Sequence, residues 1–157
     1  MNLEILQAPA LAPEIRRVES VKLAIANSLG QYLLLTRAAT DTNRPGTADL
    51  PGGGVDDGES PGQACLREAY EELGIRLRHE QLGEARYQER PSSYGHINRR
   101  YFWHVVLTED LPNLTLDPAE HTAFEWLPRG EAYERLNHLP LREGFALATG
   151  IVGLDRL

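Results

Sequence analysis

Residues 50–75 constrain the fold most, because a glycine-rich loop there runs directly into a helix whose two ends are both marked. The loop reads LPGGGVDDGES and combines glycines with acids. Ser60 is expected to cap the helix, Pro61 suits its first position, and Gln63 completes a capping box. The helix is expected to run to Leu73, where a glycine follows as its C-terminal stop. The segment predicts a loop and helix held in fixed relation.

In the rest of the chain, short strands and helices are mixed and do not strictly alternate. A hairpin is expected from strands at 18–26 and 31–36, with a turn at 27–30 and a polar loop from 37 to 48. Further strands are expected at 85–89, 100–107 and 123–127, and helices at 129–136 and 142–151 with Pro140 between them. Residues 1–17 are expected to be an irregular lead-in or an edge strand. We therefore expect residues 1–157 to form a single domain of the α/β (α+β) class.

Charge and cysteine content exclude several functions. The chain of 157 residues has a formal net charge of −7, which disfavours binding to nucleic acid through phosphate neutralisation. Its one cysteine excludes an internal disulfide and any multi-cysteine metal site. No apolar run reaches the roughly 20 residues of a membrane span, and the N-terminus lacks the pattern of a secretory signal. We expect a cytoplasmic protein without membrane association.

Three acids in the predicted helix are placed where their negative charges destabilise it. Glu68, Glu71 and Glu72 share one face, repel one another, and lie in the half of the helix where the dipole disfavours negative charge. A hard divalent cation such as Mg²⁺ would remove the conflict, because it takes oxygen ligands. Taken alone, the acids also fit an ordinary solvated face.

The spacing of the whole segment decides between these interpretations. Residues 53–75 fit the pattern Gly-x5-Glu-x7-Arg-Glu-U-x-Glu-Glu-x-Gly-U, where U is aliphatic. The matching residues are Gly53, Glu59, Arg67, Glu68, Ala69, Glu71, Glu72, Gly74 and Ile75. This pattern defines the Nudix box, and the chain resembles a MutT-like Nudix hydrolase. Ala69 is the weakest match, being smaller than the usual aliphatic residue.

The resemblance implies a fold, a reaction and roles for individual residues. The fold is a mixed β-sheet sandwiched between helices, and the reaction is attack of water on phosphorus assisted by Mg²⁺ or Mn²⁺. Glu71 and Glu72 match metal-binding acids, and Glu68 matches a further ligand or the base that activates water. The Gly52 carbonyl matches a backbone metal ligand. Arg67 matches the arginine that orients the glutamates, and Glu59 a structural acid bracing the loop.

For several residues outside the box, the sequence does not decide between a role at the site and a structural role. Glu120 is a candidate additional ligand or base, or an ordinary loop acid. Arg86, Arg90 and Arg100 are candidates for contacting substrate phosphates, or form surface ion pairs. Tyr94 is a candidate for stacking on a base, whereas Cys65, Phe102 and Trp103 are expected in the core. The five histidines lack metal-ligand spacing, so we expect structural or solvent roles for them.

The expected function is a Mg²⁺-dependent pyrophosphohydrolase acting on a small nucleotide, a nucleoside triphosphate or another nucleoside-diphosphate derivative. The alternative is ADP-ribose or dinucleoside polyphosphate hydrolysis, since Pro91 and Tyr94 lie near positions that distinguish such subgroups. A non-catalytic nucleotide-binding module is the alternative of another class. The resemblance is compatible with a homodimer. The sequence leaves open the substrate, the attacked phosphorus, the number of metal ions, the general base and the oligomeric state.

Overall fold

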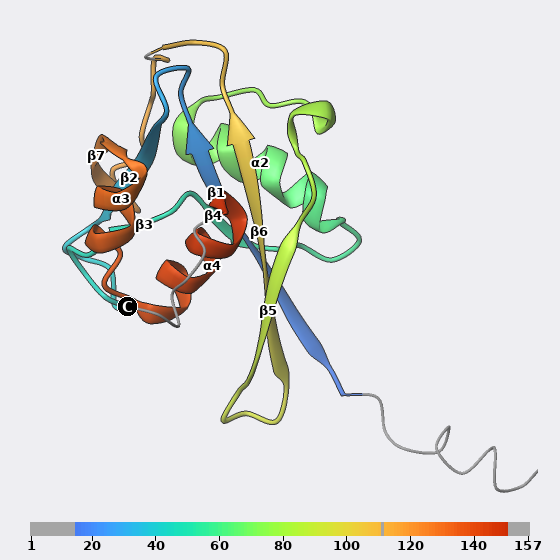
Figure 1. The fold of residues 1–157 in the computed structure, drawn as a ribbon. Helices are drawn as coiled ribbons and strands as arrows, with labels where there is room; N and C mark the ends of the chain where they lie inside the picture. Colours follow the sequence, from blue (N-terminus) through green and yellow to red (C-terminus); the bar gives the residue numbers. More distant parts are fainter. Residues whose placement is uncertain (1–14, 111, 151–157) are drawn as a thin grey trace, which may run out of the picture.

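A computed structural model describes residues 15–110 and 112–150 (Figure 1). Its strands are β1 (Arg17–Ala26), β2 (Gln31–Arg37), β3 (Ala48–Asp49), β4 (Gly52–Gly54), β5 (Arg86–Pro91), β6 (Ile97–Val106) and β7 (His121–Pro128). Its helices are α2 (Pro61–Leu73), the short 3₁₀ helix η2 (His79–Gln81), α3 (Arg129–Arg135) and α4 (Leu139–Thr149). Of the predicted lead-in, residues 1–14 lie outside the described residues, and Arg17 already belongs to β1.

Strand β1 is the centre of the sheet. It pairs in parallel with β6 along its whole length, and antiparallel with β4 and with the start of β2. Strand β2 pairs antiparallel with β3 and β7, while β5 pairs antiparallel with β6. The sheet is therefore mixed, as predicted, and the predicted hairpin at its centre is confirmed.

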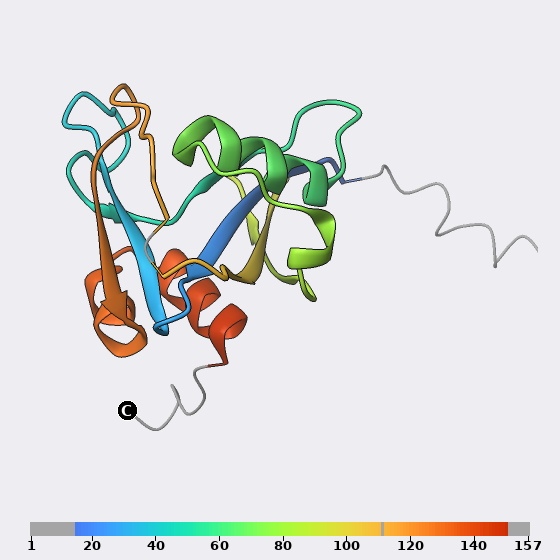
Figure 2. The ribbon, with the colours of Figure 1, turned by 90° about the horizontal axis from the view of Figure 1, so that it is seen from above.

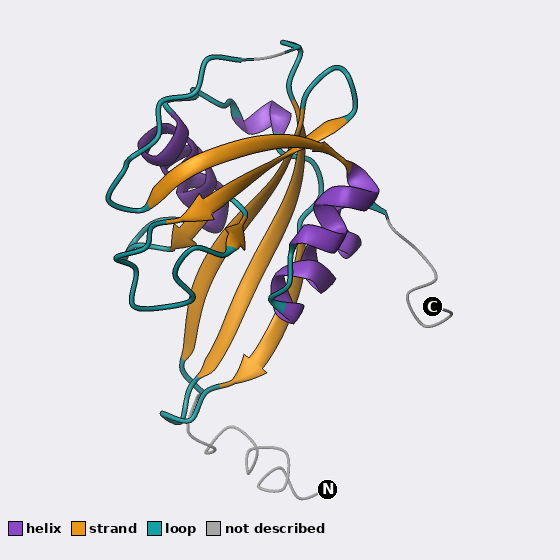
Figure 3. Ribbon diagram, turned by 90° about the vertical axis from the view of Figure 1, so that its left-hand side faces the viewer, coloured by secondary structure: helices purple, strands orange, loops and turns teal. Residues whose placement is uncertain are grey.

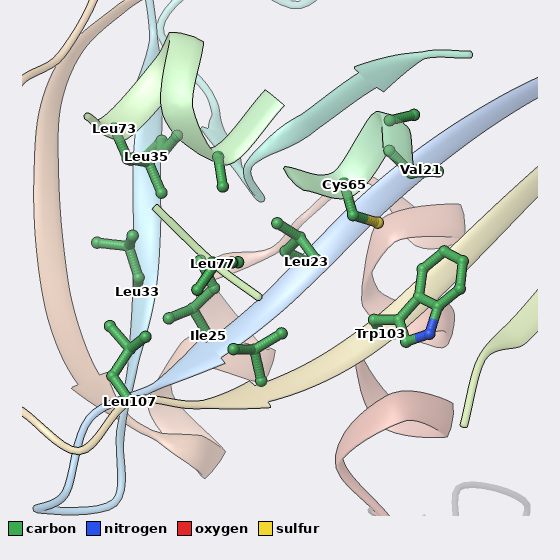
Figure 4. Close-up of a cluster of buried hydrophobic side chains, with 13 residues drawn as sticks. Val21, Leu23, Ile25, Leu33, Leu35, Cys65, Leu73, Leu77, Trp103 and Leu107 are labelled. Carbon is green, nitrogen blue, oxygen red and sulfur yellow. The ribbon is translucent and has the colours of Figure 1, made fainter. Parts of the chain in front are cut away.

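Helices cover both faces of this sheet. Helix α2 lies on one face, and α3 and α4 lie on the other (Figures 2 and 3). The period-two alternation of β1 explains the two cores, since successive side chains point to opposite faces. Val21, Leu23 and Ile25 pack in the cluster beneath α2 (Figure 4), whereas Ala24 and Ala26 pack in the cluster beneath α3 and α4. The sandwich predicted from the resemblance is confirmed, as is the core placement of Cys65, Phe102 and Trp103.

Helix α2 begins and ends where the sequence predicts. The Ser60 hydroxyl accepts a 3.1 Å hydrogen bond from the Gln63 N–H, and the Gln63 side chain accepts a 2.8 Å bond from the Ser60 N–H. Gly74 terminates the helix at φ 71°, a conformation that favours glycine. This capping fixes the register of the helix against the preceding loop.

Two local predictions were wrong. Helix α4 begins at Leu139 and contains Pro140 in its first turn, where a missing N–H costs nothing. The glycines expected in a loop form strand β4, paired with β1. No helix among the described residues has the length and apolar character needed to cross a membrane.

Candidate functional site

Strand β4 brings the glycine segment against the acids of α2. Gly52 adopts φ 142°, and a Cβ there would lie 2.0 Å from the Val21 carbonyl oxygen, so only glycine fits. Its N–H donates a 2.9 Å hydrogen bond to Oε2 of Glu72. A Cβ on Gly53 would lie 2.4 Å from Oε1 of Glu68, whereas a Cβ on Gly54 would meet no atom within 4 Å. Close approach therefore explains two of the three glycines.

Arg67 ties the loop to the helix. Its Nε and Nη2 donate 2.9 Å hydrogen bonds to the two carboxylate oxygens of Glu59, and Nη2 also donates to the Gly54 carbonyl at 2.8 Å. Its Nη1 donates to Glu68 at 3.0 Å and to Glu71 at 3.1 Å. A planar guanidinium holds several N–H donors in a fixed geometry, which a lysine cannot reproduce. The contacts agree with the orienting and bracing roles that the resemblance implies for Arg67 and Glu59.

The three glutamates of α2 differ in exposure. Glu68 and Glu72 are buried, at 8% and 4% exposed, while Glu71 lies at the surface. A helical wheel places Glu72 on a polar face and so predicts a solvent-facing side chain; this prediction was wrong. The wheel describes the helix alone, and strand β4 covers Glu72 in the folded chain.

Burial raises the pKa values of two of these carboxyls. For Glu72 the pKa rises to about 8, against the lowering effects of Lys22 and of the hydrogen bond from Gly52. The pKa of Glu68 is also raised, mainly by burial, although Arg67 opposes the rise. The negative charge of Glu120 raises both. These buried carboxyl oxygens fit a divalent cation, whose charge would offset the burial.

Glu120, just before β7, and His121, the first residue of β7, lie close to Glu72. One ligand atom each from Glu72, Glu120 and His121 lies within 4.8 Å of the others. His121 is buried, its Nε2 lies 3.1 Å from Oδ2 of Asp49, and its Nδ1 is buried without a hydrogen-bond partner. A histidine held by a carboxylate through one nitrogen is the usual arrangement of a metal-binding histidine. We therefore add His121 to the candidate donors, a residue that spacing along the sequence did not indicate.

A buried ionic network supports the floor of the site. Oδ1 of Asp49 accepts a 2.9 Å hydrogen bond from Lys22, and Oδ2 accepts one of 2.9 Å from Arg37. Burial alone would raise the pKa of Asp49, but Lys22, His121 and Arg37 together hold it well below its usual range. Asp49 is therefore ionised and balances its cationic neighbours. Sequence reasoning missed this network because its members come from separate strands.

A cavity of about 290 Å³ lies beside these groups, and Glu72 is the one glutamate of α2 that lines it, whereas Glu68 and Glu71 do not. It is lined by Gly52, Gly53, Gly54, Glu72, Glu120 and His121 on one side, and by basic residues including Lys22, Arg44 and Arg100. A neighbouring cavity of about 530 Å³ shares Arg100 and Gly54 with it and includes Arg90.

The predicted phosphate-binding arginines thus differ in position. Arg100 lines both cavities. Arg90 lines the second one, where it also pairs with Glu143 at 2.7 Å. Arg86 lines neither and is exposed beside Glu84. Tyr94 is 89% exposed.

The family model of the NUDIX domain matches residues 16–146. The chain belongs to the Nudix family. This confirms the assignment made from the box and makes the chain a hydrolase of this family.

Individual relatives match different shares of the chain, from 40% to 80% among the three described next. An 8-oxo-dGTP diphosphatase of Escherichia coli K12 is 34% identical over 59% of this chain and 69% of its own length. A CTP pyrophosphohydrolase of the same organism is 33% identical over 80% of this chain and 89% of its own length. The chain spans about 34% of the length of the Shewanella woodyi RNA pyrophosphohydrolase that it also matches. The MutT protein from Methanosarcina mazei Go1 shares the fold, with a TM-score of 0.71 at 22% identity over 88% of this chain and 97% of that one.

Proposed function

We propose that the chain is a pyrophosphohydrolase that requires Mg²⁺ or Mn²⁺ and cleaves a phosphoanhydride bond of a nucleoside triphosphate. The observation that carries the proposal is that Glu72 of the Nudix box, Glu120 and His121 lie together in one cavity with basic side chains. Cleavage of a phosphoanhydride needs positioning and charge neutralisation more than covalent help. The CTP pyrophosphohydrolase, which matches 80% of the chain, and the 8-oxo-dGTP diphosphatase are both named for nucleoside triphosphates, which supports this substrate class.

The proposed donor set combines the ligands that the Nudix box implies with the group that lies together in the structure, Glu72, Glu120 and His121. Glu68, Glu71, Glu72 and the Gly52 carbonyl would hold the cation, and Glu120 or His121 would complete its ligands. When bound, the cation neutralises phosphate charge and makes a water molecule more acidic. Carboxylate and carbonyl oxygens suit Mg²⁺ and Mn²⁺ better than softer metals.

The protein's own groups would carry out the proton transfer. The oxygen of the attacking water forms a bond to phosphorus, and the bond from that phosphorus to the bridging oxygen breaks. The leaving group takes the electron pair: it is pyrophosphate if the α-phosphorus is attacked, and the nucleoside monophosphate if the β-phosphorus is attacked. Glu120, an exposed residue that lines the cavity, and Glu68 are the two candidates for accepting the proton of that water. Arg67 holds Glu68 and Glu71 in place through Nη1.

Product analysis by mass spectrometry tests the proposal. The protein is incubated with Mg²⁺ and canonical or oxidised nucleoside triphosphates, ADP-ribose, nucleotide sugars, dinucleoside polyphosphates or coenzyme A, with EDTA in parallel. We expect a nucleoside monophosphate and pyrophosphate from a triphosphate, and no product with EDTA. Cleavage of ADP-ribose or of a dinucleoside polyphosphate alone would replace the proposed substrate class. Nucleotide binding without any cleavage would overturn the proposed enzymatic activity and would favour a non-catalytic nucleotide-binding module.

A further inference from the structure

Arg44 has an unusual backbone conformation beside the candidate site. Its φ is 56°, and it is the one non-glycine residue with positive φ in the described part of the chain. The next residue is Pro45, which further restricts the backbone before it. The Arg44 carbonyl accepts hydrogen bonds from the Thr47 N–H and hydroxyl, so the turn is well defined. A residue other than glycine, held in such a conformation, is expected where its side chain has a task.

One nitrogen of the partly buried Arg44 side chain lacks a hydrogen-bond partner. Its Nη1 is buried without any hydrogen-bond partner, although the side chain lines the cavity of about 290 Å³. Among residues 15–110 and 112–150, no carboxylate pairs with it within 4.0 Å. Arg37, in the same cavity wall, contrasts with it, since Arg37 pairs with Asp41 at 2.6 Å and with Asp49 at 2.9 Å.

Arg100 is the second cation in this cavity without a carboxylate partner among the described residues. Its side chain is half-buried, and Nε donates a single long hydrogen bond of 3.3 Å to the Ser20 hydroxyl. Burial lowers the pKa values of both arginines, and the charge of Arg44 lowers that of Arg100 further. Two neighbouring guanidiniums in a partly buried wall are costly unless an anion compensates them.

The acids that line this cavity are already occupied. Asp49 is shared by Lys22, Arg37 and His121, and Asp41 by Arg37. Glu72 and Glu120 belong to the candidate cation site. The anion that compensates Arg44 and Arg100 must therefore come from outside the described chain.

We propose that Arg44 and Arg100 form an anion subsite that binds the terminal phosphate of the substrate. This inference rests on the proposed function for the identity of the ligand. A terminal phosphate has three non-bridging oxygens and nearly two negative charges, whereas an internal one has two such oxygens and one charge. Two guanidiniums supply donors in fork geometry that match the terminal group better. The subsite thus favours triphosphates over diphosphates esterified at both ends.

Calorimetric titration with inorganic pyrophosphate tests the subsite in EDTA and at low salt, where no metal contributes to binding. Arg44→Gly removes the guanidinium and suits the positive φ, so the variant is expected to fold; its circular dichroism and thermal melt check this. We expect wild type to bind pyrophosphate and Arg44→Gly to bind it about tenfold more weakly or worse. Arg44→Lys, which keeps the charge but loses the fork, should fall between them.

Arg78→Gly is the matched control, because Arg78 is 78% exposed and lies outside both cavities. It should bind pyrophosphate as wild type does. Equal affinity of wild type and Arg44→Gly, or no binding to wild type, would overturn the subsite. This test is independent of turnover: binding that depends on Arg44 in a protein that cleaves nothing would leave the subsite standing and overturn the proposed function.

Discussion

The backbone N–H of Gly52 donates a 2.9 Å hydrogen bond to the carboxylate of Glu72, twenty residues later in the chain. This bond joins strand β4 to helix α2 at the point where both meet the cavity. It also explains why Glu72 is buried although it lies on the polar side of its helix. The proposed cation site depends on this contact, because it holds the Glu72 carboxylate against β4 at the wall of the cavity.

Replacing Arg67 with lysine tests whether the glutamates must be held in position by the guanidinium, since the substitution leaves all of the carboxylates in place. Lysine keeps the charge but cannot donate at once to Glu59, Glu68 and Glu71, as the guanidinium does. Loss of a group that orients metal ligands typically costs about 10–100-fold in activity or metal affinity. We expect Arg67→Lys to lower kcat and Mn²⁺ affinity by about this factor without unfolding. If the variant matches wild type in kinetics and in Mn²⁺ titration, the hydrogen bonds that Arg67 donates to the glutamates have no role in metal binding or catalysis.

Asp49→Asn should destabilise the fold by about 3 kcal/mol, because it leaves Lys22 and Arg37 without their shared buried anion. Urea unfolding measures the change. Glu125→Gln is the control, since Glu125 pairs with Arg135 at the surface, where such pairs contribute at most about 1 kcal/mol. Equal effects of the two substitutions would contradict the importance of the buried network.

His104 should make stability depend on pH in the acid range. Its Nε2 lies 2.9 Å from the Tyr32 hydroxyl, and burial, assisted by Arg129, lowers its pKa below the ordinary 6.5. The folded protein thus binds this proton less tightly than the unfolded chain. The resulting stability is fully present above about pH 6.5 and is lost as the pH falls through the lowered pKa.

Urea unfolding at about pH 7.5 and about pH 5 compares wild type with His104→Gln. The free energy of unfolding should fall more steeply toward acid pH in wild type than in the variant. Both proteins contain the same carboxylates, so the difference between their slopes reports His104. Parallel slopes would mean that His104 protonates equally in the folded and unfolded chain.

Local signals in the sequence predicted the parts of the fold that local physics decides. Ser60, Gln63 and Gly74 mark the ends of α2 because capping depends on residues only a few positions apart. The Nudix box gave Arg67 and the three glutamates in one helical segment, so their proximity followed from the spacing.

The remaining parts of the site depend on tertiary contacts. Asp49 and His121 lie 72 positions apart and meet because β3 and β7 both pair with β2. Nothing in the sequence around Arg44 predicts its positive φ or the lack of a hydrogen-bond partner at its Nη1. Arg86 and Arg90 follow the same period on β5, yet only Arg90 reaches a cavity next to the site. Periodicity predicts which face a residue is on and leaves open what that face contacts.

The most direct test of the account is the hydrolysis rate of Glu72→Gln with Mg²⁺ and the nucleotide that wild type cleaves best. Glutamine keeps the size of the side chain and an oxygen that can accept the Gly52 N–H, but it removes the charge that would hold the cation. The account predicts a native circular dichroism spectrum and a loss of at least about a hundredfold in rate. A folded variant that turns over at nearly the wild-type rate would contradict the assignment of the metal site and of the mechanism built on it.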